Sequence, residues 1–165
     1  MDERLVKIFR VIYEGEAKAV LRLKLFAKQA DKEELPQIAK LFRAIAVSEE
    51  IHGERALRML REIKDTESNL KESFENETSV AGVAYDTFLK VAAELNDTVS
   101  SLVFSHSRDV EDIHAGLYKK ALSHLMEEKE TSYYVCQVCG YVSDGTLPEN
   151  CPVCSAPKTV FTESA

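Results

Sequence analysis

Hydrophobic and polar positions repeat with helical spacing along four long segments of the chain. In each segment apolar residues recur every three or four positions, which is the pattern of an amphipathic α-helix. Pro36 falls in the first turn of the second segment, where proline is tolerated, and Asn96 and Asp97 form a break before the fourth. The pattern predicts a mainly α fold with helices over about 3–30, 36–64, 70–95 and 98–128.

The composition changes after the fourth segment. The charged residues 127–130 are typical of a solvated helix end, and residues 133–161 are rich in Cys, Gly, Pro and Val and have no helical period. We therefore place a domain boundary near residue 130. The sequence predicts a helical domain over 1–130 and a small second domain over 131–165.

The apolar stripes of the four predicted helices all carry inward-facing polar residues. In the first half of the helical region a glutamate is followed 33 residues later by a Glu-x-x-His pair, and in the second half the separation is 34. This near-repeat places one glutamate on the first and third helix stripes and a Glu-x-x-His pair on the second and fourth. The set consists of Glu16, Glu49, His52, Glu77, Glu111 and His114.

These residue types and spacings favour a metal site. Residues three apart on a helix are neighbours, so a Glu-x-x-His pair can hold one ion from a single helix. Four carboxylates and two imidazoles are costly in an apolar core unless they are paired or bound to cations, and two divalent ions cancel the four negative charges. Mixed oxygen and nitrogen ligation suits iron or manganese and also admits zinc. His106 and His124 lack a matching glutamate, and we interpret them as ordinary polar residues.

The four cysteines form a second candidate metal site. Cys136-x-x-Cys139 is separated by eleven residues from Cys151-x-x-Cys154, and two such knuckles present four thiolates in tetrahedral geometry. The spacing fits both a structural zinc ion and a redox-active iron ion. A domain of this size needs its metal in order to fold in either case.

Composition and charge exclude several classes of partner. The net charge is −7 and there is no basic run, which argues against nucleic acid and against an anionic membrane surface. No apolar run approaches the roughly 18 residues that a membrane span requires, and the charged N-terminal stretch lacks the apolar core of a signal peptide. Cysteines in CxxC pairs without an export signal favour metal over disulfides, so we expect a cytoplasmic protein.

The chain resembles the rubrerythrin family over almost its whole length. The stretches that carry the resemblance are EGEAKA, IAKLFRAIAVSEEIHGER, ESNLKESFENET, VEDIHAGLYKKA, VCQVCGY and NCPVCSAPK. The resemblance implies a ferritin-like four-helix bundle followed by a small rubredoxin-like β module. It also implies a homodimer, and some family members exchange helices between subunits.

The resemblance implies an activity and its cofactors. Rubrerythrins are peroxidases that reduce hydrogen peroxide to water at a non-haem di-iron centre, in defence against oxidative stress. Electrons arrive through an FeS4 centre, ultimately from a reduced nicotinamide cofactor by way of partner redox proteins such as rubredoxin. The cofactors implied here are two iron ions in the helical domain and one iron bound by the four cysteines, with zinc as a substitute.

The resemblance also assigns roles to individual residues. The six glutamates and histidines of the helix stripes match the di-iron ligands of the family, and the four cysteines match its FeS4 ligands. Tyr85 matches a tyrosine of the family's active site, so we expect its hydroxyl to donate a hydrogen bond to a ligand carboxylate.

Three positions depart from the family pattern. The family usually has another glutamate three residues after the one matched by Glu77, and this position is Val80 here. In the family that glutamate exchanges with the histidine matched by His52 when the iron changes oxidation state, and valine cannot ligate. A second active-site tyrosine is replaced by Leu23, and Ser155 replaces the glycine usual after the last cysteine.

Two alternatives to the peroxidase stay open. Six ligands also suit a ferroxidase or an oxygen-reducing ferritin-like protein, and the Leu23 and Val80 departures are compatible with a metal-binding sensor that has no turnover. The assembly is open as well. If extended, the 13 steps from Lys64 to Glu77 span about 43 Å, enough for the third helix to return to the same bundle or to reach a neighbouring subunit.

Overall fold

A computed structural model describes residues 1–123 and 131–164 of the chain. The chain forms two compact units, Met1–Lys64 and Asp65–Ala165, and each is described by itself. The expected end of the fourth helix, His124 and the charged residues 127–130 lie outside the described residues. The domain boundary near 130 falls at the edge of this stretch and stays a prediction.

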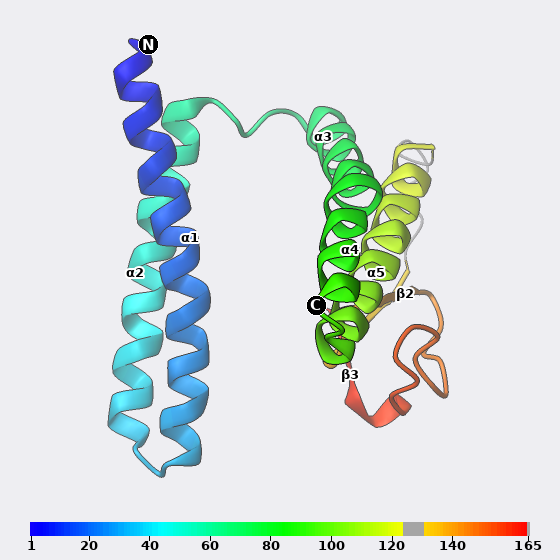
Figure 1. The fold of residues 1–165 in the computed structure, drawn as a ribbon. Coiled ribbons are helices and arrows are strands. Elements are labelled where there is room, and N and C mark those ends of the chain that lie inside the picture. The colour runs from blue at the N-terminus through cyan, green and yellow to red at the C-terminus, as the bar shows by residue number, and fades with distance from the viewer. Residues whose placement is uncertain (124–130, 165) are drawn as a thin grey trace. The chain divides into compact units, whose positions relative to one another are not determined.

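The first unit is a hairpin of two long helices (Figure 1). Helix α1 (Glu3–Lys32) begins after Asp2, whose carboxylate accepts a hydrogen bond of 2.8 Å from the backbone N–H of Arg4. Helix α2 (Pro36–Leu60) begins with the proline at its first position, as expected. The short turn between the helices contains Glu34 in the left-handed conformation (φ 58°). A turn of this length places the two helices side by side in antiparallel order.

Small residues form the contact between α1 and α2. The buried residues of the hairpin are Ala27, Ala30, Ala39, Ala46, Gly53 and Ala56. A Cβ atom added at Gly53 would lie only 3.6 Å from the Cβ of Glu16, so the helices approach closely where the predicted ligands lie. The larger apolar residues are not buried: Ile12 and Ile45, on the glutamate stripe, are 37% and 38% exposed. The hairpin therefore leaves an apolar face on its surface.

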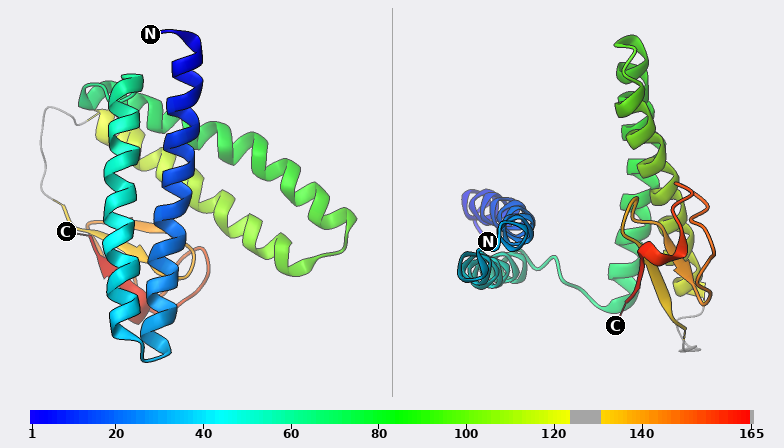
Figure 2. Two further views of the ribbon diagram at one scale, coloured as in Figure 1. Left: turned by 90° about the vertical axis from the view of Figure 1, so that its left-hand side faces the viewer. Right: turned by 90° about the horizontal axis from the view of Figure 1, so that it is seen from below.

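The second unit contains another antiparallel helix pair (Figure 2). One arm is continuous and consists of α3 (Thr66–Ser79), the π-helix η1 (Val80–Ala84) and α4 (Tyr85–Glu94). The other arm is α5 (Thr98–Ser123). Asp65 caps α3 by accepting a 2.9 Å hydrogen bond from the N–H of Ser68, and Asp97 caps α5 in the same way from Ser100 (3.0 Å). Four long helical segments are therefore present, which confirms the mainly α class.

The helix boundaries and the π-helix differ from the sequence-based expectations. Helix α2 ends at Leu60 and not near 64, because Arg61 adopts the left-handed conformation (φ 58°). Helix α3 begins at Thr66, four residues earlier than expected. Within the third segment the N–H of Tyr85 donates a hydrogen bond to the carbonyl of Val80, which is the i to i+5 pattern of a π-helix. The spacing of hydrophobic residues does not reveal this pattern.

A three-stranded antiparallel sheet follows the helices. Its strands are β1 (Tyr133–Cys136), β2 (Val142–Asp144) and β3 (Phe161–Glu163), in the order β2-β1-β3. A short 3₁₀ helix (Lys158–Val160) precedes β3. The sheet has little apolar core, and Cys136 and Cys151 are its largest fully buried side chains. This module lies against α5 mainly through β2.

Among the described residues, no helix is both long and apolar enough to cross a bilayer. The expected cytoplasmic location stays a prediction.

Candidate metal sites

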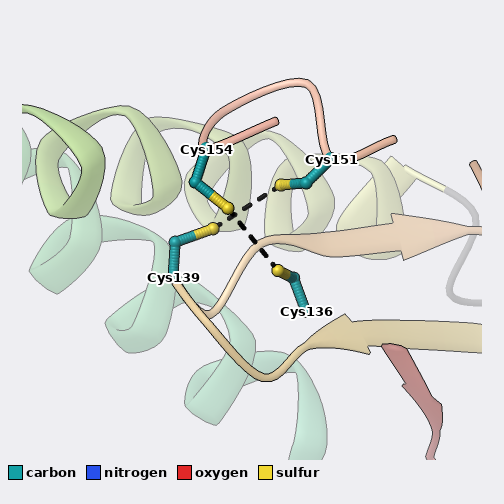
Figure 3. Close-up of side chains that lie close together, drawn as sticks. All are labelled: Cys136, Cys139, Cys151 and Cys154. Carbon is teal, nitrogen blue, oxygen red and sulfur yellow. Dashed lines mark hydrogen bonds between the residues drawn. The ribbon is translucent and has the colours of Figure 1, made fainter. Parts of the chain in front are cut away.

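The four cysteine thiols of the module face a common centre (Figure 3). The Sγ atoms of Cys136 and Cys154 are 3.8 Å apart, and those of Cys139 and Cys151 are 3.6 Å apart. A tetrahedral ion with metal–sulfur bonds of about 2.3 Å places its sulfur atoms about 3.8 Å apart. The thiol positions therefore fit a single tetrahedral ion.

Two equivalent turns hold the thiols in place. In each knuckle the fourth residue after the first cysteine donates its N–H to that cysteine's carbonyl: Gly140 to Cys136 and Ser155 to Cys151, both at 2.9 Å. Both residues adopt the left-handed conformation, with φ values of 86° for Gly140 and 61° for Ser155. This conformation is free of strain for glycine and strained for other residues. It gives a physical reason for a glycine at each position, and Ser155 departs from it.

The surroundings of the thiols change how readily each one loses its proton. Burial raises the pKa of Cys139 and of Cys154 above the usual thiol value. Burial also raises the pKa of Cys136, but hydrogen bonds from the N–H groups of Cys139 and Val138 outweigh it and lower that pKa. Since a metal binds thiolates, binding at this site releases protons.

The first carboxylate–histidine triad lies on the α1–α2 hairpin. Glu16, Glu49 and His52 each offer one ligand atom, and these atoms lie within 4.8 Å of one another. The Nδ1 atom of His52 is 2.9 Å from the carboxylate of Glu49 one turn earlier, as the Glu-x-x-His spacing predicts. The side chain of His52 is 50% exposed, so this triad lies on the uncovered face of the hairpin.

The second triad, Glu77, Glu111 and His114, joins α3 to α5 and is less exposed. Nδ1 of His114 lies 3.1 Å from Glu111 and 3.8 Å from Glu77, and its side chain is only 24% exposed. Burial raises the pKa of Glu77, and the negative charge of Glu111 raises it further. Two carboxylates held this close repel each other unless one binds a proton or both bind a cation.

Both triads fit the requirements of a divalent ion. Carboxylate and imidazole ligands bind such ions at about 2.0–2.2 Å, so two ligands on opposite sides of one ion are roughly 4.4 Å apart. The ligand atoms within each triad lie within 4.8 Å of one another, which is compatible with this span. The structure thus brings the six predicted residues together in threes, one triad in each unit, and their role as ligands stays a prediction.

The other predicted positions lie nearby on the same helices. Tyr85 begins α4, and its ring packs edge-on against Phe88 with centroids 5.6 Å apart. The hydrogen bond expected from its hydroxyl stays a prediction. Val80 is the first residue of η1, and Leu23 is half-buried on α1. His106 belongs to none of the three candidate metal groups found among the described residues.

Sequence reasoning missed the contacts between α5 and the cysteine module. The Nε2 atom of His114 lies 3.3 Å from the carbonyl oxygen of Gly140, the residue after Cys139. Lys120 forms a salt bridge with Asp144 at the end of β2. The partners are 26 and 24 residues apart, and no local spacing rule connects them.

Comparisons with known proteins match both the helical region and the cysteine module. The sequence model described as "Rubrerythrin" matches residues 7–122, and "Rubrerythrin, rubredoxin-like domain" matches residues 134–162. Rubrerythrin-2 of Clostridium acetobutylicum is 28% identical over 169 residues, which cover 92% of each chain. Nigerythrin of Nitratidesulfovibrio vulgaris is 28% identical over 162 residues, which cover 90% of this chain and 80% of nigerythrin.

A solved structure of nigerythrin in its fully reduced, all-ferrous state has a similar fold. The two chains are 26% identical, and their superposition has a TM-score of 0.60. The match covers 97% of this chain and 86% of the nigerythrin chain. These matches confirm the predicted resemblance and fold class: a ferritin-like helical region followed by a rubredoxin-like module.

The left-handed conformation of Ser155 predicts a stabilising substitution. Ser155→Gly removes the steric strain at φ 61° and should stabilise the module by about 1 kcal/mol. The measurement is the guanidinium midpoint at which the metal-loaded module loses its cysteine-to-metal absorption. Ala156→Gly, at the next position, serves as the control and should lower the midpoint. If Ser155→Gly also lowered it, the strain argument would be wrong.

Proposed function

Because the chain belongs to the rubrerythrin family, whose members are generally oxidoreductases, we propose that it is a non-haem di-iron peroxidase that reduces hydrogen peroxide to water. Reduction of one peroxide molecule to two waters takes two electrons and two protons, and a pair of ferrous ions supplies the electrons and Lewis acidity. The four cysteines would hold one further iron, which would supply the electrons that reduce the pair again. The all-ferrous state of nigerythrin supports iron over zinc.

The contact between His114 and Gly140 carries this proposal. One edge of the imidazole, Nδ1, belongs to the carboxylate triad, and the other edge, Nε2, faces the carbonyl beside Cys139 at 3.3 Å. If Nδ1 ligates a metal, Nε2 carries the proton and its N–H donates a hydrogen bond to this carbonyl, which fixes the tautomer and the ring orientation. The same side chain then joins the peroxide-reducing site to the electron-supplying site.

The two triads complement each other in charge and chemistry. Each supplies two carboxylates and one imidazole, so together they balance two divalent cations. Glutamates can bridge two ions, and the exposed apolar residues beside the first triad, such as Ile12 and Ile45, are available to be buried around them. We propose that the two triads together hold the di-iron centre.

The length of the connection between α2 and α3 limits how one chain can complete this centre. Glu49 lies 11 residues before the end of α2, and Glu77 lies 11 residues after the start of α3. In a ferritin-like bundle with a full-length crossover, the connection would have to span about 33 Å. The six steps from Leu60 to Thr66 reach only about 20–22 Å. The span of about 43 Å expected for an extended segment from Lys64 to Glu77 is therefore too long, because residues 66–79 are helical.

A second copy of the chain removes this restriction. If the α1–α2 hairpin of one copy packs against α3–α5 of another, each centre receives one triad from each copy, and the short connection only has to cross between subunits. We therefore propose a homodimer with exchanged helix pairs. An external electron donor, such as rubredoxin or a nicotinamide-dependent reductase, approaches the cysteine module, where the exposed Val138 lies between Cys136 and Cys139.

A ferroxidase or oxygen-reducing activity is the second candidate, and Val80 favours it. This residue stands three positions after Glu77, where the family usually supplies another carboxylate, and it is 39% exposed at the start of η1. Without that carboxylate, the ligand exchange that accompanies peroxide reduction in the family lacks one partner at this position.

Stopped-flow oxidation of the fully reduced protein tests the proposed function. Peroxide should oxidise the di-iron centre faster than oxygen does; the opposite order would contradict a peroxidase. Glu111→Gln should slow the peroxide reaction by at least about 10- to 100-fold, the range seen when even outer-shell partners of metal ligands are lost. Glu75→Gln, on the exposed side of α3, is the matched control and should react like the unaltered protein.

Restoring the missing carboxylate tests the second candidate. Val80→Glu should raise the rate with peroxide relative to the rate with oxygen, because it returns an oxygen ligand three residues after Glu77. Val83→Glu introduces the same charge at another exposed position of η1 and should leave the ratio unchanged. An unchanged ratio in Val80→Glu would mean that the missing carboxylate does not determine the choice of oxidant.

Complementation between two inactive variants tests the exchange of helix pairs. Glu49→Gln inactivates the triad of the first unit, and Glu111→Gln inactivates that of the second. In an exchanged dimer that contains one chain of each kind, one centre receives both altered triads and the other receives two intact ones. Unfolding and refolding the variants together should therefore restore about a quarter of the peroxide activity for random pairing. No restored activity would indicate that each chain completes its own centre.

A further inference from the structure

The cysteine module rests on α5 through two polar contacts, and a cavity lies along the same interface. The first contact is His114 with the carbonyl of Gly140, and the second is the salt bridge of Lys120 with Asp144. A cavity of about 370 Å³ separates the walls, which include Leu117, Tyr118 and Ala121 on α5 and Tyr133 and Val142 on the sheet. Apolar packing is therefore incomplete along this interface. The two polar contacts accordingly contribute more to holding the module against α5.

Asp144 is built rigidly into the module. Its carboxylate accepts a 2.8 Å hydrogen bond from the hydroxyl of Thr131, and its side chain is only 15% exposed. In the sheet it pairs with Tyr133, and Gly145 then turns the chain with its N–H bonded to the carbonyl of Ser132 at 2.8 Å. The carboxylate thus has a fixed position on the surface that the module presents to α5.

Lys120 supplies the matching charge from the helix. Its side chain is 60% exposed, and the negative charge and hydrogen bond of Asp144 raise its pKa, which keeps it a cation. Lys120 lies six residues after His114, a rise of about 9 Å along α5. Two contacts separated by this distance fix the orientation of the module, whereas the contact at His114 alone would leave it free to rotate.

We propose that Lys120 and Asp144 are positioning residues for electron transfer, because their salt bridge keeps the carbonyl of Gly140 against the imidazole of His114. Neither residue belongs to a candidate metal group among the described residues. The inference rests on the proposed function, in which one peroxide and two protons take up two electrons and give two waters. With iron at both sites, the cysteine-held ion would return the electrons one at a time, becoming ferric as it reduces one ferric ion of the pair, and the external donor would restore its ferrous state.

Mixing the fully reduced, iron-loaded chain with peroxide separates the two events. The first phase is oxidation of the di-iron centre, which tests the proposed function. The second phase is the appearance of the red ferric colour at the four cysteines, which reports electron transfer across the His114–Gly140 contact. Lys120→Met should leave the first phase unchanged and slow the second by about two- to fivefold, the effect expected for loss of one exposed salt bridge.

Two further variants distinguish positioning from a general effect of charge. Lys119→Met removes the same charge from the adjacent exposed position, which points about 100° away around the helix, and should behave like the unaltered protein. Lys120→Arg keeps the cation and should restore the second phase. High salt should slow the second phase of the unaltered protein and have little effect in Lys120→Met. An unchanged second phase in Lys120→Met, or equal slowing in Lys119→Met, would overturn the proposal.

Hydrogen exchange provides a measurement that does not depend on turnover. With zinc at the metal sites, Lys120→Met should increase amide exchange over residues 140–145, which lie at the α5 interface, and leave residues 147–163 unchanged. This result would support the positioning role even if the peroxide reaction failed. Equal exchange in the two proteins over residues 140–145 would contradict it.

Discussion

Repulsion between carboxylates on apolar helix faces is the constraint on which the rest of the structure depends. Glu77 and Glu111 meet at His114, and burial together with their mutual repulsion raises the pKa of Glu77. A cation removes this repulsion and allows the surrounding apolar surface to be buried as well. The α1–α2 hairpin packs through alanines and leaves Ile12 and Ile45 exposed beside its own triad. We therefore propose that metal binding and assembly of the helix pairs are coupled.

The cysteine module also depends on a metal ion for its stability. Its largest fully buried side chains are Cys136 and Cys151. A larger domain gains its folding free energy from an apolar core, whereas here most of that free energy must come from the metal. Helix α5 also stabilises the module, through the contact of Gly140 with His114 and the salt bridge of Asp144 with Lys120. Both contacts lie in the second unit, so one triad and the cysteine site share a compact framework.

The sequence predicted those features that local spacing determines. The Glu-x-x-His pairs meet because residues three apart on a helix are neighbours, and the CxxC knuckles converge because each is a tight turn. The π-helix at Val80–Ala84 and the left-handed Arg61 that ends α2 were not predictable, because neither leaves a mark on hydrophobic periodicity. The contacts of His114 and Lys120 with the module depend on how the sheet lies against α5, which a single sequence does not encode in any short motif.

The central claim is that two carboxylate–histidine triads bind a pair of cations jointly. Anomalous diffraction at the iron edge, from crystals of the iron-loaded protein, tests it most directly. The account predicts two neighbouring iron peaks that share ligands from both triads, Glu16, Glu49, His52, Glu77, Glu111 and His114, and a third peak among the four cysteines. Iron at the cysteines alone, or isolated ions in triads that do not meet, would contradict it.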